Sequence, residues 1–429
     1  MNIPSDWVTG LLGDLCSIEI GGTPSRNAPE YWDVAKETNN AWLSIRDLNI
    51  RVIHTTSEHI SAEGVKNSNV KLQSVGTVLM SFKLSIGRVA YAGIPLYTNE
   101  AIAGLRSEVV DHDFLYQGLQ HCDLLAGVDQ AIKGATLNKA KLKKIKFEYP
   151  PSRNEQTKIA EILSTVDQAI EQTEALIAKQ QRIKTGLMQD LLTRGIDEHG
   201  QLRTEQTHAF KDSPLGRIPV EWEVARLGEV ADISAGVTLG KSYEGPDTVE
   251  LPYLRVANVQ DGYLDLSEMK SIRVPNNHLE KYALKVGDVL MNEGGDFDKL
   301  GRGAVWRGQV PVCLHQNHVF KVRPHNETLA SDFLAAVSES PYGKSFFMMA
   351  SKQSTNLASI NSTQLKAFPI PLPDYQEQIR IQTQFNRLAE VLNGSAAELK
   401  KQRSLKAALM QDLLTGRKRV TDLLEPAAA

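Results

Sequence analysis

The sequence lacks long apolar segments and paired cysteines. No apolar run approaches the roughly 18 residues that a membrane-spanning helix needs, so we expect no membrane span. Residues 1–7 have neither the basic nor the apolar region of a secretory signal. The three cysteines, Cys16, Cys122 and Cys313, lie far apart without a CxxC pair, which supports neither a zinc site nor a disulfide framework. The cytoplasm, which is reducing, is therefore the expected compartment.

Catalytic motifs of several enzyme classes are missing as well. The sequence has no GxSxG elbow, no HExxH zinc motif and no Asn/Asp-Pro-Pro-Tyr motif of an amino-methyltransferase. Residues 235–242 (AGVTLGKS) match a relaxed phosphate-binding loop, but residues 243–246 (YEGP) cannot begin the helix that such a loop requires. Asp296 and Asp298 beside Glu293 lack the spacing of a calcium loop. We predict a chain that is not an enzyme and that itself binds no cofactor or metal.

The composition is that of an ordinary globular protein with a small excess of acidic residues. Its 429 residues suffice for two or three domains. The net charge of -3 argues against nucleic-acid binding through overall charge, because DNA-binding proteins are often basic. A local basic face can still bind DNA, since salt screens charges beyond about 10 Å. The placement of the basic residues therefore matters more than their total.

An internal repeat is the strongest signal in the sequence. The motif LMQDLLT occurs twice, 222 residues apart, and other segments recur at similar spacing. The repeat pairs residues 187–193 with 409–415, 155–156 with 377–378, 3–7 with 218–222, and 75–80 with 286–291. Because this period is far too long for a solenoid, we predict two copies of one unit of about 200 residues. A duplication without functional meaning is the alternative to a two-part target.

Each copy contains a mixed domain followed by a long helix. The mixed part has short strand-like runs between glycine turns and ends at proline-rich stops, at residues 149–151 and 369–373. Apolar residues then recur at steps of four and three, which is a heptad seam. The predicted helix-pairing residues are Ile159, Leu163, Val166, Ile170, Ile177 and Leu187 in the first helix, and Ile381, Phe385, Leu388, Leu392, Leu399 and Leu409 in the second.

Polar residues interrupt both seams at matching places, which predicts that they fix the pairing geometry. These pairs are Thr173 with Ser395, Gln180 with Gln402, and Lys184 with Lys406. The alternative is that each helix packs only on its own domain. Paired helices of roughly 58 Å, at about 1.5 Å per residue, would hold two domains farther apart than the helical turn of DNA, about 34 Å. The helices would then act as a ruler.

The predicted fold class is α+β, with two mixed α/β domains separated by two long helices that form an antiparallel coiled coil. Antiparallel pairing follows from the repeat, because two similar units commonly associate through a two-fold axis, here a pseudo-two-fold. The predicted boundaries are 1–151 for the first domain, 152–194 for the first coiled-coil helix, 195–217 for a linker, 218–373 for the second domain, 374–416 for the second helix, and 417–429 for a C-terminal tail.

Several motifs together carry a resemblance to a known family. These are the two Ile-Pro-x-x-Trp openings, residues 216–222 (GRIPVEW), the proline-bounded helices, and LMQDLLT at both helix ends. Over nearly its whole length the chain resembles the specificity (HsdS-type) subunits of Type I restriction-modification enzymes. The resemblance implies that residues 1–151 and 218–373 are target-recognition domains, each reading one half of a bipartite, asymmetric site in double-stranded DNA.

The same resemblance implies partner proteins. Two methyltransferase subunits would bind the paired helices, and restriction subunits would join through them. S-adenosylmethionine, ATP and Mg²⁺ would belong to these partners, and this chain would be a non-catalytic subunit of an adenine-methylating and DNA-cutting complex. A coiled-coil scaffold or adaptor that binds no DNA is the alternative.

Polar side chains in loops that the repeat places alike are the candidates for DNA contact. Arginine pairs with guanine and asparagine or glutamine with adenine, whereas lysine contacts phosphate. We align residues 42–47 with 253–258 and residues 98–100 with 316–318, and six lysines lie within 133–146 without an acid between them. A structural or solvated role is the alternative for each. The candidates are Ser44, Arg46, Lys83, Arg88, Asn99, Lys139, Lys143, Lys144, Arg255, Asn258, Asn292, Lys299, Arg302, Gln316, Asn317 and Lys352.

Overall fold

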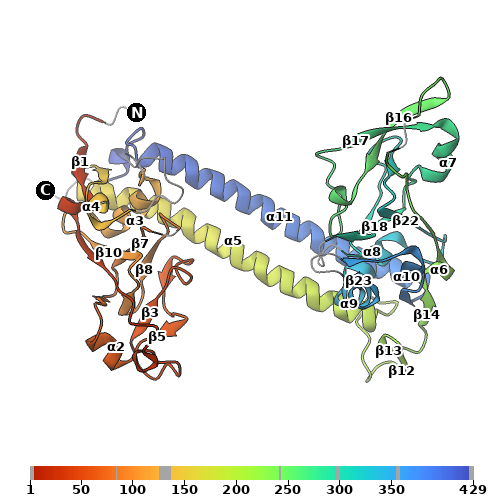
Figure 1. The fold of residues 1–429 in the computed structure, drawn as a ribbon, viewed down its shortest axis with the longest axis horizontal. Helices are drawn as coiled ribbons and strands as arrows, with labels where there is room; N and C mark the ends of the chain where they lie inside the picture. Colours follow the sequence, from red (N-terminus) through yellow and green to blue (C-terminus); the bar gives the residue numbers. More distant parts are fainter. Residues whose placement is uncertain are drawn as a thin grey trace. The chain divides into compact units, whose positions relative to one another are not determined.

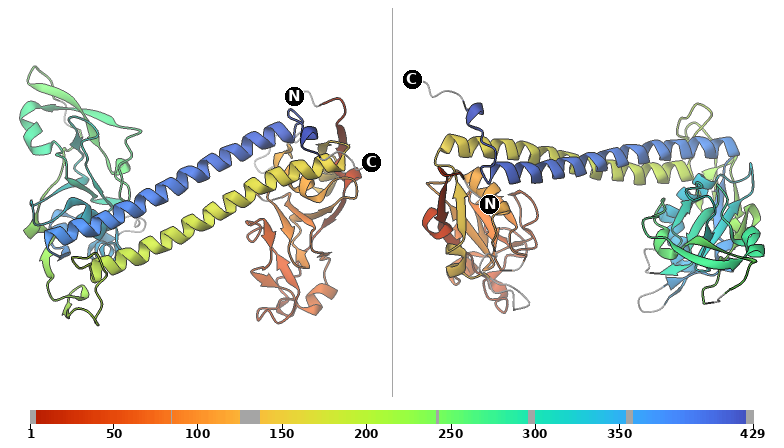
Figure 2. Two further views of the ribbon diagram at one scale, coloured as in Figure 1. Left: turned by 180° about the vertical axis from the view of Figure 1, so that it is seen from behind. Right: turned by 90° about the horizontal axis from the view of Figure 1, so that it is seen from above.

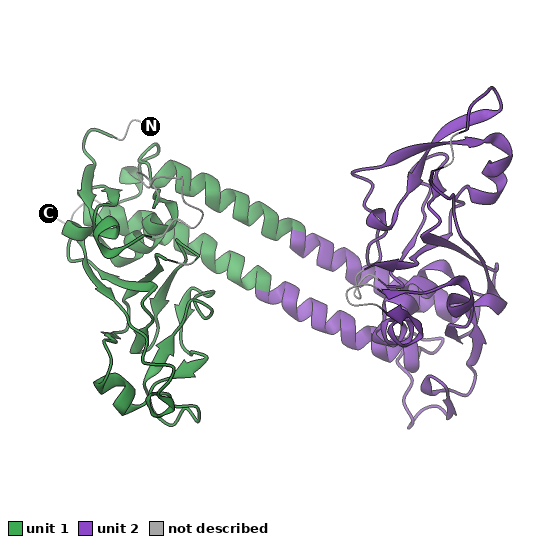
Figure 3. Ribbon diagram, in the orientation of Figure 1, with its two compact units in different colours: residues 1–174, 397–429 green, residues 175–396 purple. Residues whose placement is uncertain are grey.

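The chain divides into two compact units that both contain parts of its two long helices. The computed structural model describes residues 4–83, 85–124, 137–240, 243–295, 300–353 and 358–424. Unit 1 comprises residues 1–174 and 397–429, and unit 2 comprises residues 175–396 (Figure 3). The division crosses helices α5 (Arg153–Thr193) and α11 (Tyr375–Leu413), whose bounds agree with the two predicted helices. Each unit is therefore built from both copies of the sequence repeat.

Unit 1 is built around three antiparallel or mixed sheets (Figure 1). The largest has the order β2 (Ser17–Ile20), β10 (Ile102–Arg106), β7 (Val78–Ser81), β8 (Val89–Ala92) and β4 (Val52–Ile53); the second has β5 (Glu58–His59), β3 (Ala41–Leu43), β9 (Leu96–Thr98) and β6 (Leu72–Gln73); the third pairs β1 (Val8–Leu11) with β11 (Lys146–Tyr149). Every residue of the central strand β7 is buried, which explains the apolar run of Val78, Leu79 and Met80.

Short helices cover the sheets of unit 1. They are α1 (Leu12–Leu15), α2 (Ala62–Lys66), α3 (His112–His121) and α4 (Lys139–Lys143). Helix α3 begins after Asp111, whose carboxylate accepts hydrogen bonds from the backbone N–H groups of Asp113 and Phe114, as an N-cap does. The core of the unit joins Phe114 of α3 to Leu163 of α5.

Unit 2 repeats this plan. Its largest sheet has the strand order β15 (Ala231–Ser234), β22 (Val319–Pro324), β18 (Val289–Asn292) and β20 (Gly303–Val305). Two three-stranded sheets have the orders β17 (Lys270–Pro275), β16 (Thr248–Leu254), β21 (Leu314–His315) and β19 (Gly294–Gly295), β24 (Ala358–Ser359), β23 (Lys352–Gln353). Two strand pairs complete the unit: β14 (Glu223–Arg226) with β25 (Pro369–Leu372), and β12 (Phe210–Ser213) with β13 (Gly216–Pro219). Its short helices are α6 (Leu227–Val230), α7 (Leu279–Tyr282), α8 (Ser331–Glu339), α9 (Pro341–Ala350) and α10 (Ser362–Lys366).

The strand register confirms one predicted alignment of the repeat and corrects another. Parallel strands β3 and β9 place Leu43 opposite Thr98, and β16 and β21 place Leu254 opposite His315. Residues 42–47 therefore do match 253–258. The prediction that residues 98–100 match 316–318 is wrong by one position, because the structural equivalent of Thr98 is His315. The asparagine letters at positions 99 and 317 suggested the wrong alignment, whereas hydrogen bonding sets the true one.

Two equivalent glycines, Gly21 and Gly236, support the equivalence of Thr98 and His315. A Cβ atom added to Gly21 would lie 1.9 Å from the carbonyl oxygen of Thr98, and one added to Gly236 would lie 1.9 Å from that of His315. Only glycine allows the backbones to approach this closely. Gly236 belongs to the stretch that resembles a phosphate-binding loop, and residues 243–247 after it are not helical. This stretch is therefore a close strand crossing.

The long helices pair antiparallel within each unit, as predicted (Figure 2). In unit 1, Asp167 of α5 pairs with Lys406 of α11 at 2.6 Å, and Glu174 pairs with Arg403 at 2.7 Å, so the numbers rise along one helix as they fall along the other. In unit 2, the backbone N–H of Ile196, just beyond α5, bonds to a glutamate at the start of α11. Each predicted helix-pairing residue is buried or half-buried.

The matching seam lysines bind the short helices of the mixed domains. Lys184 donates to Glu339 of α8 at 2.7 Å, and Lys406 donates to Gln120 of α3 at 3.3 Å. Lys406 also pairs with Asp167 of the opposite long helix, in agreement with the predicted role in helix pairing. The partner of Lys184 lies on a domain helix instead, so this lysine fixes the long helix to its domain.

The repeated LMQDLLT motif forms the end of each long helix, and its leucines enter a domain core. Leu191 and Leu192 at the end of α5 are buried in the core of unit 2. Leu413 and Leu414 at the end of α11 are buried in the core of unit 1. Each long helix therefore begins against the mixed domain of its own repeat and ends against the mixed domain of the other.

A buried glutamate at the start of each long helix binds an arginine that follows the other helix. The Arg419 guanidinium donates to both carboxylate oxygens of Glu155, at 2.6 and 2.8 Å. Arg203 donates through both terminal nitrogens to Glu377, which also accepts the indole N–H of Trp222 at 3.1 Å. These two interactions hold the segment after one long helix against the start of the other long helix.

No membrane span is present among the helices of the described residues, since none combines sufficient length with sufficient apolar character.

Candidate nucleic-acid interface

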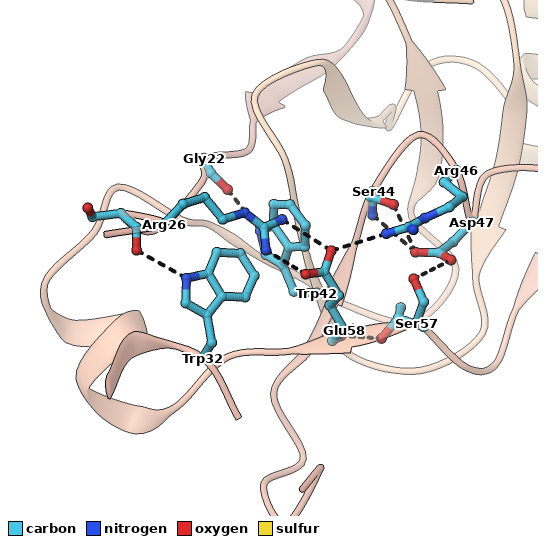
Figure 4. A network of polar contacts seen from close by, with 11 residues as sticks. Gly22, Arg26, Trp32, Trp42, Ser44, Arg46, Asp47, Ser57 and Glu58 are labelled. Carbon is cyan, nitrogen blue, oxygen red and sulfur yellow. Dashed lines mark hydrogen bonds and ion pairs between the residues drawn. The ribbon is translucent and has the colours of Figure 1, made fainter. Parts of the chain in front are cut away.

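In unit 1 the turn after β3 holds two of the predicted DNA-contacting residues. Ser44 donates to Asp47 at 3.0 Å, and Ser57 donates to the other carboxylate oxygen of Asp47 at 2.7 Å. These bonds fix the turn from which Arg46 extends, with its side chain 74% exposed. One terminal nitrogen of Arg46 lies 3.5 Å from Glu58. Ser44 is thus a turn-forming residue, and Arg46 is accessible to a ligand (Figure 4).

A cluster around Glu58 was not found by sequence reasoning. Arg26 donates two hydrogen bonds to the Glu58 carboxylate, at 2.5 and 3.1 Å. The guanidinium carbon of Arg26 lies 3.6 Å from the ring centre of Trp32 and 5.1 Å from that of Trp42. We call Arg26, Trp32, Trp42, Arg46 and Glu58 the Arg26 cluster (Figure 4). The sequence signals were the predicted residue Arg46 and Trp42, which begins an aligned segment. Glu58 was missed because only strand pairing brings it beside Trp42.

The two tryptophans support the loop that carries Arg26. The indole N–H of Trp42 donates to the carbonyl of Gly22 at 3.0 Å, and that of Trp32 donates to the carbonyl of Ser25 at 3.1 Å. The rings themselves meet edge to face, with centroids 5.0 Å apart and an angle of 90°. Aromatic pairs prefer this geometry. The loop from Gly22 to Ser25 is therefore hydrogen-bonded at both ends, to the indole groups of Trp42 and Trp32.

Lys83, another predicted residue, contributes charge near this loop. Burial would raise the pKa of Glu100, but the hydrogen bond from Thr23, a backbone hydrogen bond and the charges of Lys83 and Arg26 hold it below its usual value. Glu100 therefore stays ionised near neutral pH. Asn99 is half-buried, and its side chain accepts the backbone N–H of Ala101 at 3.1 Å, which is a turn-capping role.

The basic residues predicted at the end of the first domain lie elsewhere in unit 1. Lys139, Lys143 and Lys144 are exposed on α4 and just after it. Figure 1 places α4 beside the start of α5, away from β3 and β5. Arg88 is exposed immediately before β8. The structure thus does not gather all the predicted residues of the first domain into one site, and Lys133 lies outside the described residues.

Two candidates in unit 2 are unsuited to contact DNA in this structure, because their side chains are buried. Asn258 is 3% exposed and accepts the backbone N–H of Arg255, while its amide donates to backbone carbonyls. Asn292 is 1% exposed and donates to the carbonyl of Val259 at 3.2 Å. Asn258 occupies the position of Asp47, so both copies use this residue to form the turn. The amide groups of Asn258 in its turn and Asn292 in its strand thus bond to backbone carbonyls. The sequence alone does not distinguish this role from a contact with a base.

Other candidates in unit 2 are partly accessible. Arg255 donates to the carbonyl and carboxylate of Glu268, at 3.0 and 3.3 Å, and its side chain is 21% exposed. Arg302 is 13% exposed and donates to Gln260 at 3.1 Å. Gln316 and Asn317 are half-buried in the loop between β21 and β22. Lys299 lies outside the described residues, as do Asp296 and Asp298.

Lys352 lies on a groove of unit 2. The groove has a volume of about 580 Å³ and is lined by Lys352, Gln353, Ser359, Glu293 and His318, among others. Nδ1 of His318 and a carboxylate oxygen of Glu293 lie 2.5 Å apart. Exposed cationic and amide groups of this kind suit a phosphate backbone.

A metal site has little support in the described parts of the chain. The one cluster with suitable spacing there is formed by Asp111, His112 and Asp113. Asp111 caps α3, and Asp113 accepts the Tyr91 hydroxyl at 2.7 Å. Both carboxylates therefore have structural partners.

Comparison with known proteins identifies a family. The Type I restriction modification DNA specificity domain matches residues 4–180 and 219–401. The chain is 30% identical over 289 residues to the Type I restriction enzyme MjaVIII specificity subunit of Methanocaldococcus jannaschii, covering 65% of this chain and 63% of that protein. It is 27% identical over 267 residues to the MjaIX specificity subunit of the same organism, covering 61% and 60%. The matches thus span less than two thirds of these relatives.

Solved structures share the fold. An S subunit of a Type I restriction-modification system from M. genitalium has a TM-score of 0.58 at 15% identity, covering 96% of this chain and 97% of that chain. A structure concerned with complex assembly of the type I R-M system has a TM-score of 0.56 at 18% identity, covering 96% and 99%. At these identities the likeness concerns the fold. Since the family matches most of the sequence in two copies, this chain belongs to the Type I restriction modification DNA specificity family.

Proposed function

We propose that the chain is the non-catalytic DNA-specificity subunit of a Type I restriction-modification complex. Each mixed domain would read one half of a bipartite, asymmetric site in double-stranded DNA. One observation carries the proposal: the two domains share a framework but carry different polar side chains at equivalent surface positions. Glu58 of the first domain corresponds to the exposed Lys270 of the second, as the strand register requires, and the exposed Arg46 has the exposed Ala257 in its place. A common fold with different contact residues suits two different half-sites.

The long helices supply the proposed surface for two methyltransferase subunits. Most apolar residues of α5 and α11 are buried or half-buried, but Ile183 and Leu405 are 49% and 52% exposed. These two residues are equivalent in the repeat, and Leu176 lies one heptad before Ile183 with 47% exposure. Exposed apolar residues at matching places favour two partners bound in the same way. Restriction subunits would bind through the methyltransferases.

Catalysis and its cofactors belong to the partners in this proposal. S-adenosylmethionine, ATP and Mg²⁺ would be bound by the methyltransferase and restriction subunits, in the cytoplasm. This chain would determine which adenines are methylated by positioning the complex on DNA.

Genome-wide mapping of methylated adenines tests the proposal. The chain is expressed with its methyltransferase partner in a host that lacks other adenine methylation, and the partner alone is the control. We expect a split motif with a fixed gap that appears only when the chain is present. Methylation without a chain-dependent motif contradicts the proposal and supports a scaffold that binds no DNA.

A further inference from the structure

We propose that the Arg26 cluster is a guanine-reading site of the first domain, in which Arg26 contacts the base. This inference rests on the proposed function and assigns one base contact within it. Three features carry it: the free edge of the guanidinium, its rigid support, and the different residue that the second domain has at the position of Glu58.

The hydrogen bonds of Arg26 leave one edge of its guanidinium available. Nη1 and Nη2 both donate to Glu58, which occupies the end of the group. Among the described residues, no hydrogen bond is recorded from Nε of Arg26, so the edge formed by Nε and the outer hydrogen of Nη2 remains for a ligand. Two parallel donors on one edge match the O6 and N7 acceptors of guanine in the major groove. Adenine offers a donor in place of O6, so the same edge discriminates against it.

Aromatic stacking and the ion pair fix the direction of this edge. The guanidinium lies 3.6 Å from the ring centre of Trp32 and is held by two hydrogen bonds from one side. Arginine stacks on aromatic faces more readily than lysine because its group is planar and weakly hydrated. A side chain that is already ordered loses less entropy on binding. Arg26 is nevertheless 53% exposed, whereas Glu58 beneath it is 25% exposed, so the arginine is the accessible member of the pair.

Two exposed arginines lie beside Glu58 even though the chain is acidic overall. Arg26 and Arg46 share the single carboxylate of Glu58, so these three side chains carry an excess of positive charge. Arg46 is 74% exposed and lies on the turn beside the cluster, where it is positioned to contact a phosphate. A base contact and a backbone contact thus have separate residues.

The second domain has a different residue at the position of Glu58. Strand pairing sets Glu58 opposite Trp42 in unit 1, and it sets Lys270 opposite Tyr253 in unit 2. A lysine cannot accept the hydrogen bonds that hold Arg26. The support that Glu58 gives to Arg26 is therefore a property of the first domain.

Motif mapping with Arg26→Lys and Arg26→Gln tests the inference. Lysine keeps the charge but cannot form two parallel bonds to a base. We expect both variants to relax a guanine preference at one position of one half-site by about ten- to a hundredfold. The other half-site and the gap should stay unchanged, which shows at the same time that the variant folds and assembles. Arg194→Lys, in an exposed ion pair at the end of α5, is the matched control and should leave the motif intact.

A double variant separates base reading from a structural role. If Arg26 only neutralises Glu58, the combination of Arg26→Gln with Glu58→Gln restores the original motif, and this outcome overturns the inference. An unchanged split motif in Arg26→Lys also overturns it and leaves the proposed function standing. A wild-type chain that directs no motif removes the proposed function together with the inference.

Discussion

The residues that define each framework are a glutamate and a glutamine at the start of each long helix. Gln156 accepts the backbone N–H of Asp111 at 2.7 Å, and Gln378 accepts that of Ala330 at 2.8 Å, so each orients the helix of the adjacent domain. Glu377 is 1% exposed and its partner Arg203 is 10% exposed. Removing one member of such a buried pair leaves the other charge without compensation, which destabilises the folded state.

His315 gives unit 2 a dependence of stability on pH. Burial lowers the pKa of His315 to about 4, partly opposed by a hydrogen bond to the carbonyl of Val319. The folded state therefore favours the neutral ring. Its stabilising contribution is complete above the unfolded pKa of about 6.5, and it is lost as the pH falls from there towards 4.

We expect unit 2 to lose about 3 kcal/mol of unfolding free energy over this pH interval through His315. Urea unfolding at pH 7 and pH 4.5 measures the loss. His315→Asn keeps a donor for the carbonyl of Val319 but does not titrate, so the pH dependence should become weaker. An equally steep dependence in this variant would assign the effect to other groups.

For individual residues, the sequence predicted which types of side chain lie at the candidate site better than it predicted which of them lie together. Arg46 and Lys83 were predicted and lie near an exposed cluster of charged groups. Arg26 and Glu58 were missed because they are 32 residues apart and meet only through the pairing of β3 with β5. Asn258 was predicted to contact DNA but forms a turn, since the same amide that reads adenine also caps a backbone.

Among the elements, the long helices were the most predictable. Their heptad pattern and proline boundaries predicted two long paired helices, because helix periodicity is a local property of the sequence. The role of LMQDLLT was not predictable from pattern, since it depends on which core receives each helix end. Sheet register was predicted in part and was one residue wrong in the loop after β9.

Each long helix ends in the core of the unit where the other long helix begins, so a mutation at a helix end should destabilise the unit that contains that end. Leu413→Ala should destabilise unit 1, and Leu191→Ala should destabilise unit 2, each by about 2–5 kcal/mol, because a buried leucine is removed from a packed core. Hydrogen exchange of backbone amides locates the effect. Leu405→Ala, at an exposed position of α11, is the control and should leave both units protected. Faster exchange in the unit where the mutated helix begins, without change in the other, would contradict this assignment.

For the whole molecule, the helices are the elements that both units share. Helix α5 has 41 residues and α11 has 39. In the proposed function they determine the gap between the two half-sites. This role follows from their length and continuity across both copies of the repeat.

Seven residues added to both helices should lengthen the gap in the methylated motif. The insertions are made after Glu174 and after Ala396, where the two units divide. They add about 10 Å of helix, which corresponds to at most about three base pairs. Motif mapping measures the change, and a seven-residue insertion at Gly200, in the linker, is the control expected to keep the original gap. A gap that ignores the helix insertions would show that they do not measure distance.

The division of the chain into a continuous unit 2 and a discontinuous unit 1 has a consequence for biosynthesis. Unit 2 possesses all its residues once residue 396 has emerged from the ribosome. The first domain is made earlier, yet it lacks Leu413 and Leu414 until residue 414 has emerged. At about 5–20 residues per second, the nascent domain waits on the order of 10–50 seconds with this part of its core uncovered. The domain made first is thus the last to be completed.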